Sequence, residues 1–129
     1  MQYDRLEPHS EEAEENLLAS VLGNPGQAHR ALATLDEGDF YQLANRKIYR
    51  AIKDITESGK DPDYINVKDW LKVRQIEDHG ALDKYDEMFG LADIIESSAR
   101  MIKEKSSLRK LIRLGDKISN DCFTGSRDA

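Results

Sequence analysis

The chain has 129 residues, which is enough for one domain with a hydrophobic core but too few for two. Hydrophobic residues make up 39% and charged residues 34%, and the formal net charge is −6. Because modules that bind duplex DNA are normally basic, this charge disfavours a DNA-binding module. A single cysteine excludes an internal disulfide. Without an apolar run of roughly 18 residues or a signal-peptide pattern, we expect a cytoplasmic protein.

Charge is distributed unevenly along the chain. Residues 1–16 contain six acidic side chains and one basic one, whereas residues 100–117 contain seven basic and two acidic ones. Two interpretations are open. Both segments are solvated helix faces, or the acidic and basic ends pair across an interface or face complementary partners.

The first half of the chain is predicted to form three helices. Ser10 is a candidate N-cap for the first helix, which ends at the glycines and proline of residues 23–26. A short second helix ends at residues 36–38. Asp39 is predicted to start the third helix, because Asp39 and Gln42 resemble a capping box. The buried stripe expected for that helix comprises Phe40, Ala44, Ile48, Ala51, Ile52 and Ile55.

The second half is also predicted to be helical. Asn66 with Asp69 indicates a helix start, and residues 64–67 are expected to be an extended segment that leads into it. His79-Gly80 ends that helix, and a short helix that includes Phe89 follows. From about residue 93 a single helix of about 30 residues is expected. Its apolar stripe comprises Ile94, Ile95, Ala99, Ile102, Leu108, Leu111, Ile112 and Ile118.

The predicted fold class is therefore all-α. A compact head of about five to six helices spans residues 1–92, a long helix spans 93–123, and residues 124–129 form a loop-like end. Globular helices average about 11–12 residues, so a helix this long extends beyond the head. Its stripe must then be buried against a partner helix in the same subunit or in another one.

No pattern of catalytic or metal-binding residues is recognisable. The phosphate-binding sequence GxxxxGK[ST] is missing, and His9, His29 and His79 are far apart without a cysteine or carboxylate at metal-ligand spacing. Cys122 has no neighbouring histidine that would activate it as a nucleophile. We therefore expect that the chain itself is not an enzyme and that it binds no metal or cofactor.

The order of several short motifs is more informative than any one of them. The first helix carries Ser10, Glu12-Ala13-Glu14 and Leu22-Gly23, and Asp39-Phe40-Tyr41 precedes the third helix. The long helix carries Ala99, Met101-Ile102, Glu104-Lys105, Arg109 and Leu111-Ile112. From Pro8 to Phe123 this order resembles the N-terminal domain of the bacterial replicative DNA helicase, the DnaB family. The chain departs from that pattern at Asn45, where the family has histidine, and at His79-Gly80, where it has Gly-Gly.

The resemblance implies a non-catalytic domain with a helical head and the first helix of a helical hairpin. In this family such domains dimerise, three dimers form a collar on a hexameric ring, and the collar docks the C-terminal domain of primase and sometimes a helicase loader. ATP and Mg would belong to a motor domain beyond Ala129. DNA would be bound only through the full-length helicase, and no membrane partner is implied.

The resemblance also implies which residues contact a partner. Positions that contact primase in the family map onto Glu12, Ile112 and Ile118, and Leu108 and Leu111 neighbour them as candidates for a primase or subunit interface. Simple interpretations remain open for these residues. In these interpretations Glu12 only stabilises the helix dipole, and the segment from Leu108 to Ile118 belongs to the core of the domain itself.

Two other functions are compatible with the sequence. A stand-alone adaptor, such as a helicase loader or inhibitor, would need the same helical surfaces. A small nucleic-acid-binding domain would use the basic side of the long helix and would bind with steeply salt-dependent affinity.

Overall fold

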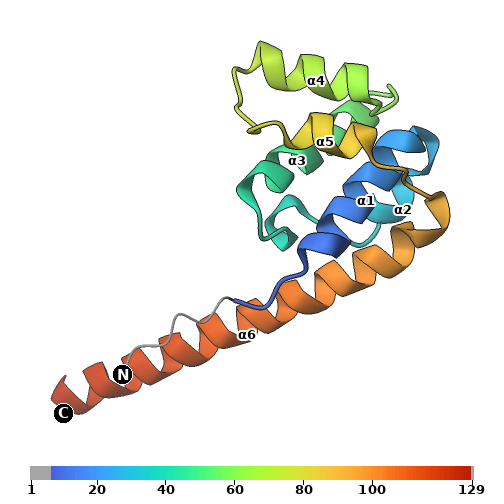
Figure 1. The fold of residues 1–129 in the computed structure, drawn as a ribbon. Helices are drawn as coiled ribbons and strands as arrows, with labels where there is room; N and C mark the ends of the chain where they lie inside the picture. Colours follow the sequence, from blue (N-terminus) through green and yellow to red (C-terminus); the bar gives the residue numbers. More distant parts are fainter. Residues whose placement is uncertain (1–6, 129) are drawn as a thin grey trace.

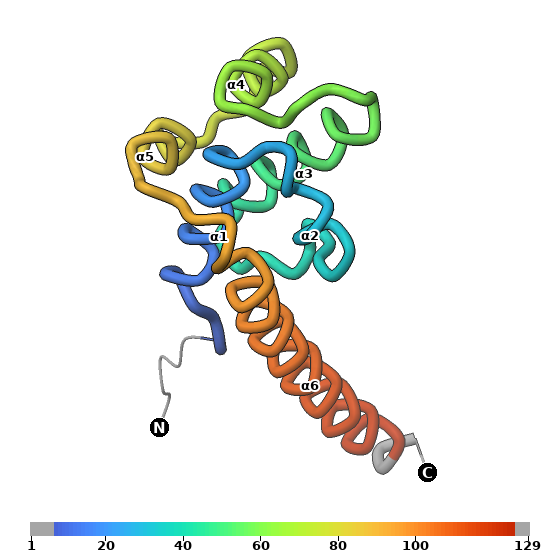
Figure 2. Tube along the Cα trace, turned by 90° about the vertical axis from the view of Figure 1, so that its right-hand side faces the viewer, coloured from blue at the N-terminus to red at the C-terminus, as the bar shows by residue number. Residues whose placement is uncertain are grey.

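The computed structural model describes residues 7–128, and every regular element within them is a helix. A compact head leads into one long C-terminal helix, which confirms the predicted fold class (Figure 1). Figure 2 shows that α4 and the free end of α6 lie at opposite ends of the molecule. The α-helices are α1 (Glu11–Gly23), α2 (His29–Leu32), α3 (Leu43–Glu57), α4 (Tyr64–Val73), α5 (Ala81–Glu87) and α6 (Ile95–Asp128), and the short 3₁₀ helices are η1 (Pro25–Gln27), η2 (Glu37–Asp39) and η3 (Ala92–Ile94).

Helix α1 lies at the centre of the head and packs against α3, α5 and α6. Ser10 caps it as predicted, because the Ser10 hydroxyl accepts a hydrogen bond of 3.1 Å from the Ala13 amide. Its apolar side chains are almost completely removed from solvent, which makes α1 the main contributor to the core. The buried apolar residues of α1 are Ala13, Leu17, Leu18, Ala19, Val21 and Leu22.

The start of α3 differs from the prediction. Asp39 ends η2 instead of starting α3, and α3 begins at Leu43. The Asp39 carboxylate is unavailable as a cap for α3, because it accepts hydrogen bonds from the Asp36 amide at 2.8 Å and from the Ser106 hydroxyl at 2.7 Å. Phe40 is buried as expected, but it precedes the helix.

Helix α4 begins two residues before the predicted start. Asp63 is its N-cap, with a carboxylate oxygen 2.9 Å from the Asn66 amide, so the segment expected to be extended is the first turn of the helix. Helix α4 ends at Val73, before the predicted end at His79-Gly80, and Gln75 with positive φ follows it. His79 and Gly80 also have positive φ, but they precede α5 instead of ending α4. Phe89 lies outside α5 and is exposed instead of forming part of the helix.

Helix α6 has 34 residues and reaches Asp128, so the loop-like end expected for residues 124–129 is wrong for 124–128. The Thr124 hydroxyl donates to the carbonyl of Asn120 at 3.0 Å, a bond compatible with continuing helix. One glycine on an exposed helix costs only about 1 kcal/mol, which does not end it. Ala129 lies outside the described residues. We call residues 108–128 the arm.

The apolar residues of α6 do not form the single stripe that was predicted. Near the head, Ile95, Ala99 and Ile102 are buried against the other helices. The residues Leu108, Leu111, Ile112 and Ile118, which we call the arm face, are between 40% and 63% exposed. At 3.6 residues per turn, the arm face lies roughly half a turn around the helix from the buried face. The helix therefore presents one apolar side to the head and another away from it.

Candidate protein-docking surface

The arm face is a group of exposed apolar side chains on α6 that the head does not cover. From Lys110 to Gly125 every residue is exposed, so nothing in the head covers this part of α6. The prediction left the segment from Leu108 to Ile118 open between core and interface. In this chain these side chains do not belong to the core, because the head contacts the opposite side of α6 and ends near Arg109.

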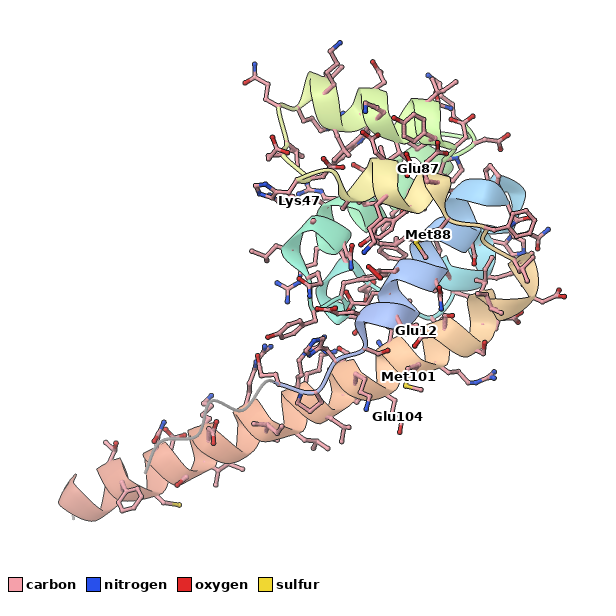
Figure 3. All side chains as sticks on the ribbon, viewed as in Figure 1. Glu12, Lys47, Glu87, Met88, Met101 and Glu104 are labelled. Atoms are coloured by element: carbon pink, nitrogen blue, oxygen red, sulfur yellow. The ribbon has the colours of Figure 1, made fainter. Side chains whose placement is uncertain are left out.

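Glu12 lies on the same side of the molecule as the start of the arm face. Figure 3 shows Glu12 on α1 next to Met101 and Glu104 on α6. An open groove of about 320 Å³ runs between the two helices, and both Glu12 and Met101 line it. Met101 and Leu108 are seven residues apart and thus on one side of α6, so the groove leads towards the arm face. Four of the five predicted partner residues lie on α6, and α1 supplies the fifth.

Met101 is a surface residue that the sequence reasoning did not select. It is 42% exposed and connects Glu12 with the arm face. Its spacing of seven residues from Leu108 is a helical signal that could have identified it. The stripe of the buried residues around Ile102 concealed this signal, because apolar residues in this part of α6 lie on more than one side.

A buried arginine anchors α6 where the helix leaves the head. The guanidinium of Arg109 is 2% exposed and donates to the main-chain carbonyls of Pro8 and Asp39, each at 2.7 Å. The Arg109 guanidinium also lies 5.5 Å from the centre of the Tyr41 ring. Three of the short motifs noted in the sequence therefore meet at one point, and this contact sets the direction of the arm.

Asp39 supplies the second anchor. Its carboxylate is 2% exposed, and the ammonium groups of Lys103 and Lys110 lie 3.2 Å and 3.5 Å from its oxygens. Burial raises the pKa of the Asp39 carboxyl, but hydrogen bonds from the Asp36 amide, Ser106 and Lys103 outweigh it and hold the pKa below its ordinary value. Asp39 is therefore an anchor that is ionised at neutral pH.

Glu14 holds the start of α3 from a position on α1. Its carboxylate is 1% exposed and accepts hydrogen bonds from the Tyr41 amide at 2.8 Å and from the Asn45 side chain at 2.9 Å. Asn45 in turn accepts a bond from the Tyr85 hydroxyl at 2.5 Å, so this network joins α1, α3 and α5. Burial, followed by the nearby charge of Glu15, raises the pKa of Tyr85 to about 12. The network is structural rather than a surface for partners.

The acidic and basic ends of the sequence meet within one chain. The Arg113 guanidinium lies 3.0 Å from the Glu7 carboxylate, and Figure 1 shows residues 7–10, which precede α1, running along α6. His9 stacks on Tyr41 with ring centres 4.0 Å apart, and its side chain is half-buried. Part of the predicted charge complementarity is therefore intramolecular.

The described side chains offer little for catalysis or metal binding. Within residues 7–125 no group of three histidine, cysteine or carboxylate side chains is close enough to hold a metal ion. Cys122 is exposed on the arm. None of the helices in the described part of the chain has the length and hydrophobicity needed to span a membrane. The features that distinguish this surface are its groove, its charged side chains and its exposed apolar groups, which together define a candidate surface for binding another protein.

Comparison with known proteins identifies the family. Residues 6–108 match the model of the DnaB-like helicase N-terminal domain family. The replicative DNA helicase DnaB of Geobacillus stearothermophilus is 33% identical over 125 residues, which cover 94% of this chain but 28% of that protein. The replicative DNA helicase DnaC of Bacillus subtilis is 31% identical, with the same coverage. The chain thus spans less than a third of the length of these relatives.

Two solved structures share the fold. The N-terminal domain of DnaB helicase from Mycobacterium tuberculosis aligns with a TM-score of 0.89 and 26% identity, covering 96% of this chain and 91% of that one. The corresponding domain from Helicobacter pylori, described together with its interactions with primase, aligns with a TM-score of 0.72 and 19% identity, covering 86% and 89%. The chain belongs to the DnaB-like helicase N-terminal domain family.

Proposed function

We propose that this chain is the non-catalytic N-terminal domain of a hexameric replicative DNA helicase, in which it mediates oligomerisation and docks the C-terminal domain of primase. In the full-length protein, ATP and Mg would be bound by a separate C-terminal motor domain, and DNA would be contacted through the assembled helicase. A helicase loader is a further candidate partner. The observation that carries the proposal is the arm face, which is apolar, exposed and turned away from the head.

The anchors of α6 support a role in assembly. Arg109 and Asp39 fix the helix on the head, so the arm projects in a defined direction. A fixed surface loses little conformational freedom when a partner binds, which favours association. A rigid arm also sets the distance between subunits, and this is the geometric function expected of a collar.

Glu12 supports a role in docking. Its carboxylate is exposed beside the groove that leads to the arm face, so a partner that covers Leu108 and Ile112 would also reach it. We propose primase as this partner because the H. pylori domain of the same fold is described with its interactions with primase. Glu12 would add charge selectivity to an otherwise apolar contact.

Nucleic-acid binding by the isolated chain is less well supported. Of the seven basic residues between 100 and 117, four contact acceptors of this chain: Lys103, Arg109, Lys110 and Arg113. These contacts leave fewer free positive charges for a phosphate backbone, and the net charge of the chain is −6.

Sedimentation velocity of Ile112→Asp tests the oligomerisation. Ile65→Asp is a matched control, because Ile65 is 74% exposed on α4, remote from the arm. We expect the wild type and the control to form dimers and Ile112→Asp to sediment as a monomer with unchanged helicity. If Ile112→Asp dimerises like the control, the arm face is not the subunit interface. If Ile112→Asp unfolds, Ile112 contributes to the core and the proposal fails for this residue.

A further inference from the structure

The head contains an open cavity between the first turns of α1, α3 and α5 and the loop that precedes α5. Its volume is about 580 Å³, which is within the range of small-molecule sites. The two residues at which the chain departs from the family pattern, Asn45 and His79, both line it. Figure 3 shows Lys47, another residue of the lining, apart from Glu12 and Met101. The cavity is therefore separate from the docking surface.

The lining of this cavity has more acidic side chains than basic ones. The acidic residues are Glu11, Glu15, Glu77 and Asp78, and the lysines are Lys47 and Lys84. Lys84 forms an ion pair with Glu15. Among the described residues, no ion pair involves Glu11, Glu77 or Asp78. The cavity therefore carries uncompensated negative charge, which favours a cationic ligand.

Neutral donors hold two of the acidic side chains in position without cancelling their charge. The side-chain amide of Gln42 donates to one oxygen of Glu11 at 3.1 Å, and the backbone amide of His79 donates to one oxygen of Glu77 at 2.7 Å. For the second oxygen of each carboxylate, the described residues provide no donor. Because these carboxylates are already oriented, they lose little conformational freedom when they accept further hydrogen bonds from a ligand.

A buried hydroxyl adds a neutral acceptor to the lining. Tyr85 is 5% exposed and lines the cavity together with Asn45. The Tyr85 hydroxyl donates its own proton to the Asn45 side chain, and no described group donates to the hydroxyl oxygen in return. The raised pKa of Tyr85, caused first by burial and then by Glu15, indicates that negative potential reaches this hydroxyl. The lining is thus suited to a ligand that is rich in N–H donors.

The spacing of the acidic groups favours an organic cation over a metal ion. A metal ion needs several ligands around one point. Within the described residues, no group of three histidine, cysteine or carboxylate side chains is close enough to hold one. Leu43, Ala44 and Ala81 add apolar surface to the lining. Separated negative charges and apolar surface match a ligand in which methylene groups connect two or more ammonium groups, because such chains pack on apolar surface while their charged ends pair with carboxylates.

We propose that this cavity binds a linear aliphatic polyamine. One ammonium group pairs with Glu11 and Glu15 on α1, and another pairs with Glu77 on the loop before α5. The methylene groups between them lie on Leu43 and Ala81. Such a ligand joins α1, α3 and α5, so it stabilises the head and leaves the arm face free. Binding of the polyamine requires neither the oligomerisation nor the primase docking proposed above.

Calorimetric titration of the chain with spermidine, a linear trication, tests the proposal. We expect saturable binding with one spermidine per chain. Hexaamminecobalt(III) is a compact trication that also carries N–H donors, and it should bind at least about tenfold more weakly because it cannot reach the separated carboxylates together. Equal affinities for the two trications would mean that only total charge matters, and this result would overturn the proposal. An absence of saturable spermidine binding would overturn it as well.

Two double variants of equal net charge locate the binding site. Glu11→Gln with Glu77→Gln removes two charges from the lining but keeps an acceptor oxygen at each position, and the affinity for spermidine should fall at least about tenfold. Glu57→Gln with Glu104→Gln is the matched control, because both residues are exposed outside the cavity. The control should bind spermidine like the wild type. Equal affinities of the two double variants contradict the assignment of the cavity as the site.

Amide chemical shifts of the wild-type chain provide a measurement that needs no substitution. In a titration with spermidine, we expect the largest changes at residues 11–15, 42–47 and 77–85, including the side-chain amide of Asn45. The acidic residues Asp86, Glu87 and Asp93 are exposed but lie outside the lining of the cavity. If the largest changes occur at those three residues instead, spermidine binds to general surface charge and the proposed site is wrong.

Discussion

The guanidinium of Arg109 donates a hydrogen bond of 2.7 Å to the main-chain carbonyl of Asp39, although the two residues are 70 positions apart in the sequence. A second bond of the same length reaches the carbonyl of Pro8. One side chain thus connects the arm, the segment before α1 and the turn before α3. The direction of the arm, and with it the position of the arm face, depends on this arginine.

Replacing Arg109 should destabilise the fold. Arg109→Met leaves two carbonyl groups without their donors in a buried place, and we expect the free energy of unfolding to fall by about 3 kcal/mol. Urea denaturation followed by circular dichroism measures the change. Arg100→Met is the control, because Arg100 is exposed on the same helix and should shift stability by no more than about 0.5 kcal/mol. Equal stabilities of the two variants would contradict the anchoring role.

The ionisation of the Asp39 carboxyl should make the free energy of unfolding depend on pH. The pKa of its carboxyl is lower in the folded chain than its ordinary value of 3.8, so the carboxylate stabilises the fold above that value. This stabilisation is lost as the pH falls through the folded pKa. The stability difference between wild type and Asp39→Asn should therefore be largest near neutral pH and should shrink in acid.

Urea titrations of the two proteins between neutral and acidic pH test this prediction. Asp116→Asn, an exposed position on α6, is the control and should track the wild type at every pH. A difference between wild type and Asp39→Asn that stays constant through the acid range would mean that ionisation of Asp39 does not matter for stability.

Glu14 and Glu12 belong to one sequence motif but should respond differently to substitution. Glu14→Ala removes the acceptor of the Tyr41 amide and the Asn45 side chain, and we expect a loss of about 3 kcal/mol. Glu12→Ala changes an exposed residue and should leave stability within about 0.5 kcal/mol. Thermal and urea unfolding of the two variants compare them directly. A destabilised Glu12→Ala would contradict its assignment as a surface residue.

Two glycines form a further matched pair. Gly90→Ala places a Cβ atom 2.5 Å from the backbone of α1 and should destabilise the chain by about 1–3 kcal/mol. Gly115→Ala adds a methyl group to open space on the arm and should stabilise α6 by about 0.5–1 kcal/mol. Opposite shifts of the unfolding midpoint are expected, and a stabilising Gly90→Ala would contradict the close packing of Gly90 on α1.

The sequence was sufficient for the order of the main helices but not for all of their ends or for the contacts between them. Helical spacing identified the helices and the buried side of α3, because that information is local. The role of Asp39 was misjudged because its partner Ser106 is 67 residues away. The same limit applied to α6: spacing reveals that Ile102 and Leu108 are apolar positions, but only the packed head decides which of them is covered. The resemblance to the DnaB family was carried by motifs whose residues include Glu14 and Arg109, both of which hold the head together.

Calorimetric titration with the C-terminal domain of primase tests the central claim most directly. The claim is that the arm face is a docking surface for another protein. We expect wild type and Ile65→Asp to bind with the same affinity, and Ile112→Asp to bind at least about tenfold more weakly, which corresponds to about 1.4 kcal/mol. If folded Ile112→Asp binds as tightly as Ile65→Asp, primase does not dock on the arm face.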